Sequence, residues 1–284
     1  LLSLLYDNTS DILSQLIRTA FVSPEGYSLL PTDFSAIEAR VLAWLAGETW
    51  RLGVFKTHGK IYEASASQMF KVPLDSIGKG SPLRQKGKVA ELALGYQGGP
   101  GALVAMGALK MGIPEEELPV LVNAWRKANP KIVRYWYTVQ DACKEAISTG
   151  EPQSLPHGIK VLMKKGAMLI TLPSGRQLSY LRAKLKPGKF GDAIIYEGMD
   201  QTTKQWKQID TYGGKLVENV TQAVARDCLA DAMLRLDAAG FKIVMHVHDE
   251  AVLEEPDLDI RLDQVNEIMG TPIPWAKGLP LKAE

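Results

Sequence analysis

The stretch FKIVMHVHDEAVLE, residues 241–254, decides the fold class. Two runs rich in β-branched and other apolar residues meet at His248-Asp249, a polar pair that a tight turn accepts. This pattern predicts an antiparallel hairpin. Residues 215–239, immediately before it, predict a helix that ends at Gly240, because glycine commonly follows the last helical turn. A helix followed by a hairpin indicates a mixed α/β fold.

The rest of the chain is predicted to form a helical middle between two β-containing flanks. A short strand is predicted at 27–32 and a helix at 35–46, whereas 50–165 is mainly helical and includes a helix at 82–97. Further strands are predicted at 168–172, 193–197 and 203–209, the last two as a pair. This order predicts one mixed domain interrupted by a second, helical one.

The composition is that of a globular protein with a sizeable core. Of 284 residues, 46% are hydrophobic and 23% are charged, which excludes disordered, collagen-like and coiled-coil classes. No apolar run approaches the roughly 20 residues of a membrane span, so no membrane partner is expected. Cys143 and Cys228 stand alone, which disfavours a disulfide framework and a zinc ribbon and indicates a reducing cytoplasm. The net charge of +1 is compatible with nucleic-acid binding through a local patch.

Asp33 lies at the predicted junction of a strand and a helix, in the stretch DFSAIEAR (residues 33–40). An aspartate held there can project into a cleft and bind a metal ion. However, Ser35 and Glu38 have the spacing of a capping box, and an acid favours a helix N-terminus. From this stretch alone an ordinary cap is favoured, because caps are commoner than metal sites.

The stretch HVHDE, residues 246–250, gathers acids and imidazoles at the predicted hairpin tip. Period-two alternation places His246 and His248 on one face and Val247 and Asp249 on the other. Such clusters serve metal-dependent hydrolysis and phosphoryl transfer. A polar turn explains the same residues equally well, and two histidines on one face suit zinc, although no further Cys or His completes four ligands.

A third pattern is a stripe of residues four positions apart on the predicted helix at 82–97. Arg84 and Lys88 are followed by Leu92 and Tyr96, which would lie on one helix face. Cations followed by an aliphatic and an aromatic side chain suit a triphosphate joined to a base. Taken alone, a solvated basic turn leading into a core-facing half is the favoured interpretation.

Together, in this order and at this spacing, the three stretches resemble the family A DNA polymerases over nearly the whole chain. Residues 33–40 resemble motif A, the Arg84–Tyr96 stripe is similar to motif B on the helix that closes over the nucleotide, and His248-Asp249-Glu250 matches motif C. Residues 18–21 and 171–176 also resemble family sequence, and 87–96 is typical of the phage and prophage branch.

The resemblance implies the core of a template-directed DNA polymerase, which adds dNTPs to a primer 3′-hydroxyl by two-metal-ion nucleotidyl transfer. Asp33 and Asp249 are expected to bind two Mg²⁺ ions, for which Mn²⁺ is expected to substitute, with Glu250 as an accessory acid. Arg84 and Lys88 are expected to hold the β- and γ-phosphates, and Lys88 to assist protonation of the leaving group.

The remaining implied roles concern the sugar, the base and the DNA. Glu38 is expected to exclude a ribose 2′-hydroxyl, and Tyr96 to pack near the templating base. Leu92 and Tyr62 are expected to contact the nucleotide. Primer–template contacts, or positioning of the acids, are expected from Arg40, Arg176, Gln222 and His248.

Four positions depart from the family pattern. Leu92 replaces the aromatic residue that touches the incoming sugar, which puts discrimination at the 3′ position in doubt. Tyr62 stands where a triphosphate-contacting histidine is common, and its hydroxyl donates a hydrogen bond without bringing charge. His246 stands where the family usually has glutamine, and Gln97 where glycine usually follows the tyrosine.

The resemblance also implies a domain plan. A palm with an antiparallel sheet and packed helices is expected at 1–49 and 167–284, with an inserted all-helical fingers subdomain at 50–166. The expected partners are primer–template DNA and dNTPs, and we expect a monomer in the cytoplasm of a bacterial or phage-infected cell.

The thumb and the 3′–5′ exonuclease precede this region in the family. Because the chain starts without methionine, they are expected elsewhere in a parent polypeptide or in a separate chain. Without the thumb's phosphate contacts the chain is expected to be weakly active or inactive.

Two other function classes fit parts of the pattern. A two-metal nuclease would degrade labelled DNA and would not need the Arg84–Tyr96 stripe. A non-catalytic nucleic-acid-binding module would bind DNA without turnover, and substitution of Asp33 or Asp249 would leave its binding unchanged or stronger.

Overall fold

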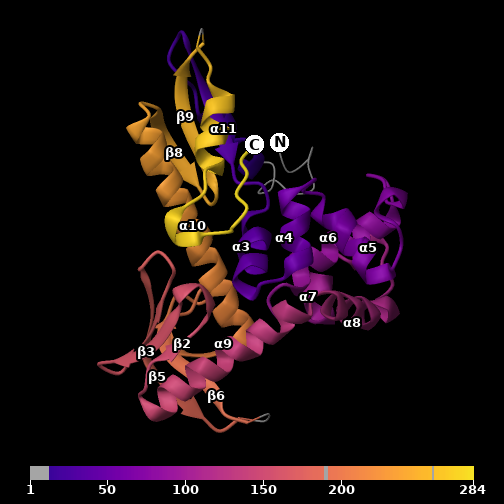
Figure 1. The fold of residues 1–284 in the computed structure, drawn as a ribbon, viewed down its shortest axis with the longest axis vertical. Coiled ribbons are helices and arrows are strands. Elements are labelled where there is room, and N and C mark those ends of the chain that lie inside the picture. The colour runs from indigo at the N-terminus through magenta and orange to yellow at the C-terminus, as the bar shows by residue number, and fades with distance from the viewer. Residues whose placement is uncertain (1–12, 189–190, 258) are drawn as a thin grey trace. The chain divides into compact units, whose positions relative to one another are not determined.

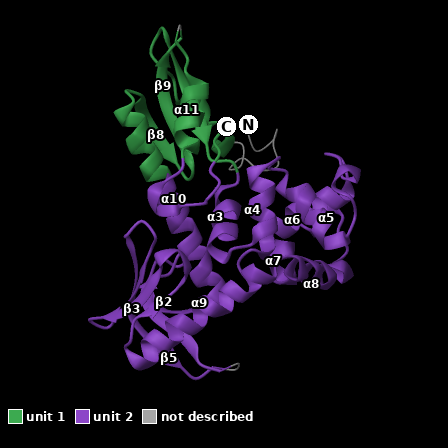
Figure 2. Cartoon of the chain, in the orientation of Figure 1, with its two compact units in different colours: residues 1–35, 229–271, 282–284 green, residues 36–228, 272–281 purple. Residues whose placement is uncertain are grey.

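A computed structural model describes residues 13–188, 191–257 and 259–284, and the chain divides into two compact units (Figure 2). Unit 1 comprises Leu1–Ser35, Leu229–Thr271 and Lys282–Glu284. Unit 2 comprises Ala36–Cys228 and Pro272–Leu281. No helix in the described ranges is both long and apolar enough to cross a membrane.

Unit 1 is built on a three-stranded antiparallel sheet in the order β1-β9-β8 (Figure 1). Its strands are β1 (Tyr27–Asp33), β8 (Lys242–Val247) and β9 (Glu250–Pro256). The predicted hairpin is confirmed, since β8 pairs with β9 across a two-residue turn. Helix α11 (Leu262–Gly270) packs against β1, where the Thr32 hydroxyl donates to Asn266 Oδ1 at 2.6 Å.

The first part of unit 2 is a group of helices. It contains α3 (Ile37–Ala46), α4 (Thr49–Lys56), α5 (Ile61–Phe70), α6 (Pro82–Leu94), α7 (Pro100–Ala105), α8 (Leu118–Ala128) and α9 (Pro130–Thr149). Buried Ala43, Phe55 and Ile61 join α3, α4 and α5 in one core. The rings of Trp125 and Trp136 stack at 6.1 Å between α8 and α9. Short 3₁₀ segments are Ile17–Ala20, Leu74–Ser76, Leu109–Met111, Glu115–Glu117, Pro156–Gly158 and Pro274–Ala276.

A six-stranded antiparallel sheet follows in unit 2, and its strands are adjacent in chain order. They are β2 (Gln153–Ser154), β3 (Lys160–Lys164), β4 (Ala167–Thr171), β5 (Gln177–Lys186), β6 (Ala193–Met199) and β7 (Trp206–Thr211). Helix α9 packs along this sheet (Figure 1). Helix α10 (Gly213–Ala238) comes next and contributes residues to both units.

Most predicted elements are confirmed, including the mixed α/β class, the β6–β7 pair and α10, which ends at Ala238, two residues before Gly240 with its φ of 84°. The prediction that helices continue to about 165 is wrong, because strands begin at Gln153. β2 has two residues and β3 five, too few for period-two alternation to stand out from the helices before them.

Two local predictions also need correction. Helix α3 begins at Ile37 and its N-cap is Ala36 in the left-handed conformation, so Ser35 does not occupy the N-cap position that the expected capping box requires. His248 has a φ of 56° and lies in the turn, so it does not share a strand face with His246. The predicted palm and fingers boundaries do not coincide with the two compact units and stay a prediction.

Candidate functional site

Asp33 is held in unit 1 by hydrogen bonds on both sides of its strand. On one side it pairs with Glu250 in the register of β1 and β9, and the neighbouring Phe34 amide donates to the Asp249 carbonyl at 3.3 Å. On the other side, Asp33 and Glu284 exchange two backbone hydrogen bonds of 3.1 Å each. The sheet therefore brings the predicted motif A and motif C acids, Asp33 and Asp249, to neighbouring positions.

The surroundings of Asp33 disfavour the ionised form of its carboxyl group. Partial burial raises the pKa of Asp33, and the nearby carboxylates of Asp249, Glu284 and Glu250 raise it further. Asp249 Oδ1 lies 2.8 Å from His248 Nδ1. A bound cation would remove the repulsion among these carboxylates.

Glu250 has one satisfied and one unsatisfied carboxylate oxygen. Its Oε2 accepts a hydrogen bond from Arg18 Nη2 at 3.0 Å. Its Oε1 is buried and has no hydrogen-bond partner among the described residues. A buried acceptor in this state is unfavourable, and a nearby cation or a metal-bound water would satisfy it.

The residues present fit a hard divalent cation. No group of three or more His, Cys, Asp or Glu side chains within the described ranges is arranged to hold a metal ion. Mg²⁺ does not require such a cage, since it is usually bound through one or two carboxylates together with waters and substrate phosphates. Asp33 and Asp249 are a donor set of that kind, and zinc, which prefers four nitrogen or sulfur ligands, is not matched.

Arg84, on α6 of unit 2, is paired with an acid that the sequence pattern did not single out. Its Nε donates to Glu63 Oε1 on α5 at 2.7 Å, and its guanidinium lies 5.5 Å from the centre of the Tyr62 ring. Burial is the largest single influence and raises the pKa of Glu63, but the hydrogen bond from Arg84, a backbone hydrogen bond and the charges of Arg84 and Lys60 together lower the pKa below its usual value. Because this bond uses Nε, both terminal guanidinium nitrogens can serve as donors to another anion.

Helices α5 and α6 approach closely enough for this contact because Gly87 lies between them. A Cβ atom at Gly87 would meet the Tyr62 carbonyl oxygen at 2.3 Å. Lys88 follows Gly87 on α6 and is half-buried, whereas Leu92, one turn later, is 49% exposed. Arg84, Lys88 and Leu92 therefore follow the predicted helical spacing, and Tyr96 lies two residues beyond the end of α6.

Glu38 and Tyr96 form a direct contact in unit 2. The Tyr96 hydroxyl donates to Glu38 Oε2 at 3.0 Å. Burial and the Glu38 carboxylate raise the pKa of Tyr96 well above its usual value, so the hydroxyl keeps its proton and remains the donor. The residue expected to exclude a ribose and the residue expected near the templating base thus fix each other's position.

The four residues expected at DNA occupy different environments. Arg40 is 2% exposed and donates to the carbonyls of Phe55 and Pro280, which argues against a direct phosphate contact. Arg176 is partly exposed and holds Asp227 on α10 at 2.6 Å. Gln222 on α10 is exposed, and so is His248 in the turn of unit 1.

A buried polar network anchors α6 at Glu91, about two turns after Arg84. Glu91 accepts hydrogen bonds from Arg51, from the Ser65 hydroxyl at 2.8 Å and from Trp125 Nε1 at 3.0 Å. The Arg51 and Glu91 side chains are 1% and 4% exposed. This network and the Arg84–Glu63 pair join different helices, so no spacing within one helix predicts them.

A family model and several DNA polymerases are similar to this chain. The family model described as DNA polymerase family A matches residues 9–152. The chain is 61% identical over 285 aligned residues to a DNA polymerase of Bacillus phage SP02, and the alignment covers 100% of this chain and 44% of that protein. It is 28% identical to a thermostable DNA polymerase I of Thermus aquaticus, over 86% of this chain and 24% of the relative.

A solved structure has the same fold. The POL domain of Pol1 from M. smegmatis, in complex with DNA primer-template and dNTP, superposes with a TM-score of 0.61 at 23% identity, covering 94% of this chain and 41% of that one. The chain thus spans less than half the length of each of these proteins. The family match covers half of the chain, and it includes the motif A acid and the Arg84–Tyr96 stripe. This chain belongs to DNA polymerase family A.

Proposed function

We propose that this chain is the catalytic core of a template-directed DNA polymerase, which joins dNTPs to a primer 3′-hydroxyl by two-metal-ion nucleotidyl transfer. The observation that carries the proposal is the pairing of β1 with β9, which places Asp33 beside Asp249 and Glu250. Asp33 at the end of β1 and Asp249 in the turn before β9 are suited to share divalent cations, and the raised pKa of Asp33 reflects the carboxylates around it.

In this proposal Asp33 and Asp249 are the metal ligands. When bound, Mg²⁺ would lower the pKa of the primer hydroxyl and neutralise charge on the leaving pyrophosphate. Glu250 would act as an accessory acid through its unpaired Oε1, while Arg18 fixes the other carboxylate oxygen. Mn²⁺ should substitute for Mg²⁺, since both accept carboxylate and water oxygens.

The triphosphate would be bound by Arg84 and Lys88. Arg84 is held at its Nε by Glu63, so its two terminal nitrogens are oriented in advance as a fork for a phosphate. Lys88 lies one turn later on the same helix and can donate a proton to the leaving group. The Tyr62 hydroxyl adds a neutral donor on the α5 side.

Selection of deoxyribose would depend on Glu38. Its carboxylate is fixed by the Tyr96 hydroxyl, and a rigid side chain excludes an extra 2′-hydroxyl better than a mobile one. Leu92 would touch the sugar through an aliphatic surface.

Primer–template DNA is the proposed partner of a monomeric protein. Arg176, Gln222 and His248 are exposed or partly exposed and are the proposed contacts, whereas Arg40 would act by supporting α3. The relatives are more than twice as long, and we expect the chain on its own to grip duplex DNA weakly and extend primers slowly.

The test uses a labelled primer–template, excess protein, and Mg²⁺ or Mn²⁺ in separate reactions. We expect addition of the template-complementary nucleotide by the unchanged chain, loss of addition in Asp249→Ala, and retention in Asp237→Ala, an exposed carboxylate of α10 in the same unit. Degradation of the label would favour a nuclease, and DNA binding without turnover a binding module.

Nucleotide binding provides a second test, which does not depend on turnover. Divalent-dependent binding of a dNTP, measured by equilibrium dialysis, should be present in the unchanged chain and weakened in Lys88→Ala. Absence of both nucleotide addition and divalent-dependent dNTP binding would refute the polymerase assignment.

A further inference from the structure

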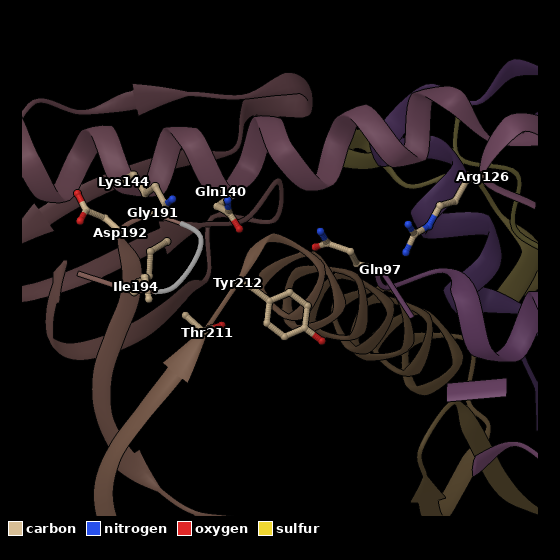
Figure 3. A pocket seen from close by; sticks show the side chains of 11 residues that line it. Gln97, Arg126, Gln140, Lys144, Gly191, Asp192, Ile194, Thr211 and Tyr212 are labelled. Carbon is tan, nitrogen blue, oxygen red and sulfur yellow. The ribbon is translucent and has the colours of Figure 1, made fainter. Parts of the chain in front are cut away.

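A pocket of about 530 Å³ lies within unit 2 (Figure 3), and none of its lining residues was given a role above, although Gln97 directly follows Tyr96 in the chain. Its walls come from the segment after α6, from α8 and α9, from residues 188 and 191–194 at the start of β6, and from the junction of β7 with α10. The polar side chains that line it are Gln97, Arg126, Gln140, Lys144, Asp192, Thr211 and Tyr212.

The two glutamines are oriented by the first turn of α10. Gln140 Oε1 accepts the Gly213 amide at 2.9 Å, and Gln97 Oε1 accepts the Gly214 amide at 3.0 Å. Because both carboxamide oxygens are used in this way, the NH₂ groups are the ends that can meet a ligand. The pocket therefore presents hydrogen-bond donors beside the positive end of a 26-residue helix.

The described charged side chains that line the pocket carry a net positive charge. Among the described residues that line the pocket, Lys144 and Arg126 are the cations and Asp192 is the one carboxylate. Lys144 has no ion pair with any acid in the described ranges, and Arg126 donates only to the Gly98 carbonyl, at 3.1 Å. In Figure 3 the nitrogen-bearing ends lie in a row along one side of the pocket, in the order Lys144, Gln140, Gln97, Arg126.

Two buried donors in this wall have no hydrogen-bond partner among the residues that the structure describes. Thr211 is 5% exposed, and its hydroxyl makes no hydrogen bond within the described part of the chain. The Arg126 Nε is in the same state. Unpaired buried donors are unfavourable in a folded protein and are commonly satisfied by a ligand or an ordered water. This observation is independent of the charge of the pocket and also indicates a polar acceptor.

We propose that this pocket binds a nucleotide unit of a nucleic-acid strand. A phosphate would lie against Lys144 and the two glutamine NH₂ groups, which are donors of the kind that phosphates favour. The Tyr212 ring, 50% exposed on the opposite side, offers a face on which a base can stack. The strand as ligand rests on the proposed function, whereas the phosphate chemistry rests on the pocket alone.

The first measurement is the affinity for a fluorescein-labelled single-stranded oligonucleotide at several salt concentrations, without divalent ions or dNTPs. Lys144→Ala should weaken binding about tenfold and reduce the magnitude of the salt slope by about 0.7, the contribution of one phosphate contact on a single strand. Thr211→Val should weaken binding severalfold and leave the slope unchanged. The control Lys127→Ala, an exposed lysine of α8 outside the pocket, should change neither quantity.

The second measurement follows the side-chain amide signals of Gln97 and Gln140 by NMR during titration with the oligonucleotide, with dTMP and with inorganic phosphate. Shifts with the oligonucleotide support the site, and additional shifts with dTMP or phosphate identify a free nucleotide or phosphate as a second source of the same ligand chemistry. Unmoved glutamine signals in all three titrations, or a Lys144→Ala affinity and slope equal to those of Lys127→Ala, would overturn the inference.

These outcomes are separate from those of the polymerase test. Strand binding in the pocket needs neither Asp33 nor Asp249, so Asp249→Ala should keep its affinity for the oligonucleotide. Primer extension by a chain whose pocket variants bind normally would leave the proposed function intact and refute only the pocket.

Discussion

The buried pair of Arg51 and Glu91 offers a test of how α6 is held in place. In Glu91→Leu the Arg51 guanidinium keeps its charge at 1% exposure and loses the carboxylate to which it donates. Ser65 and Trp125 lose the same acceptor. The leucine fills most of the volume, so the main effect is electrostatic.

The expected loss of stability is large. Removing one member of a buried ion pair costs about 3–5 kcal/mol, since the other charge remains desolvated. At about 1.4 kcal/mol per tenfold, this lowers the folding equilibrium constant by roughly two to three and a half orders of magnitude. The free energy of unfolding of a whole domain is only about 5–15 kcal/mol, so the Glu91→Leu variant should retain only a small part of it.

The double variant Arg51→Leu/Glu91→Leu distinguishes charge burial from simple loss of contacts. It removes more native hydrogen bonds than Glu91→Leu, yet it should be more stable, because no unpaired charge stays buried. It should not reach the stability of the unchanged chain, since Ser65 and Trp125 have lost their acceptor on Glu91.

The assay is urea unfolding followed by tryptophan fluorescence. All six tryptophans belong to unit 2, so the signal reports the unit that contains Arg51 and Glu91. The control is Arg182→Leu, which breaks an exposed ion pair with Glu197 and should barely change the midpoint. A double variant less stable than Glu91→Leu, or a Glu91→Leu midpoint equal to that of the control, would refute the reasoning.

Three further predictions concern the candidate site. Glu63→Gln keeps a hydrogen-bond acceptor for Arg84 but removes the negative charge of the carboxylate, so we expect a raised KM for dNTP with little change in kcat. Glu63→Ala should raise the KM further. Equal KM values in the two variants would count against Arg84 as a fork for the phosphate. Glu38→Ala should increase ribonucleotide incorporation in a primer-extension assay. Unchanged sugar selectivity would refute the role of Glu38 in excluding a ribose 2′-hydroxyl. Because the pKa of Asp33 is raised in the folded state, ionisation of its carboxylate lowers the stability of the fold once the pH rises above the pKa of the unfolded chain. Asp33→Asn should therefore unfold at a higher temperature than the unchanged chain at pH 7 without divalent ions, and this difference should vanish at low pH. A lower unfolding temperature in Asp33→Asn at pH 7 would contradict the proposed repulsion.

The parts of the fold that can be predicted from sequence are those specified locally. The β8–β9 hairpin, helix α10 and the β6–β7 pair each carry their own periodicity and their own turn or end signal. The short strands β2 and β3 carry too few residues for such a signal, so the six-stranded sheet emerges only in the structure.

The candidate site shows the same division. Asp33, Asp249 and the Arg84–Tyr96 stripe can be found from motif order and spacing. The partner of Arg84 cannot, because Glu63 is brought to it by close packing of two helices at Gly87. Likewise, no pattern within residues 33–40 indicates that Arg40 is buried against Phe55, a residue of the next helix.

The most direct test of the central claim is the rate of single-nucleotide addition by the unchanged chain, Asp33→Ala and Asp249→Ala, each at matched DNA occupancy and with Mg²⁺ or Mn²⁺. We expect addition of the template-complementary nucleotide only by the unchanged chain and only with a divalent ion. Addition at an unchanged rate by either aspartate variant, or addition in the presence of EDTA, would contradict it.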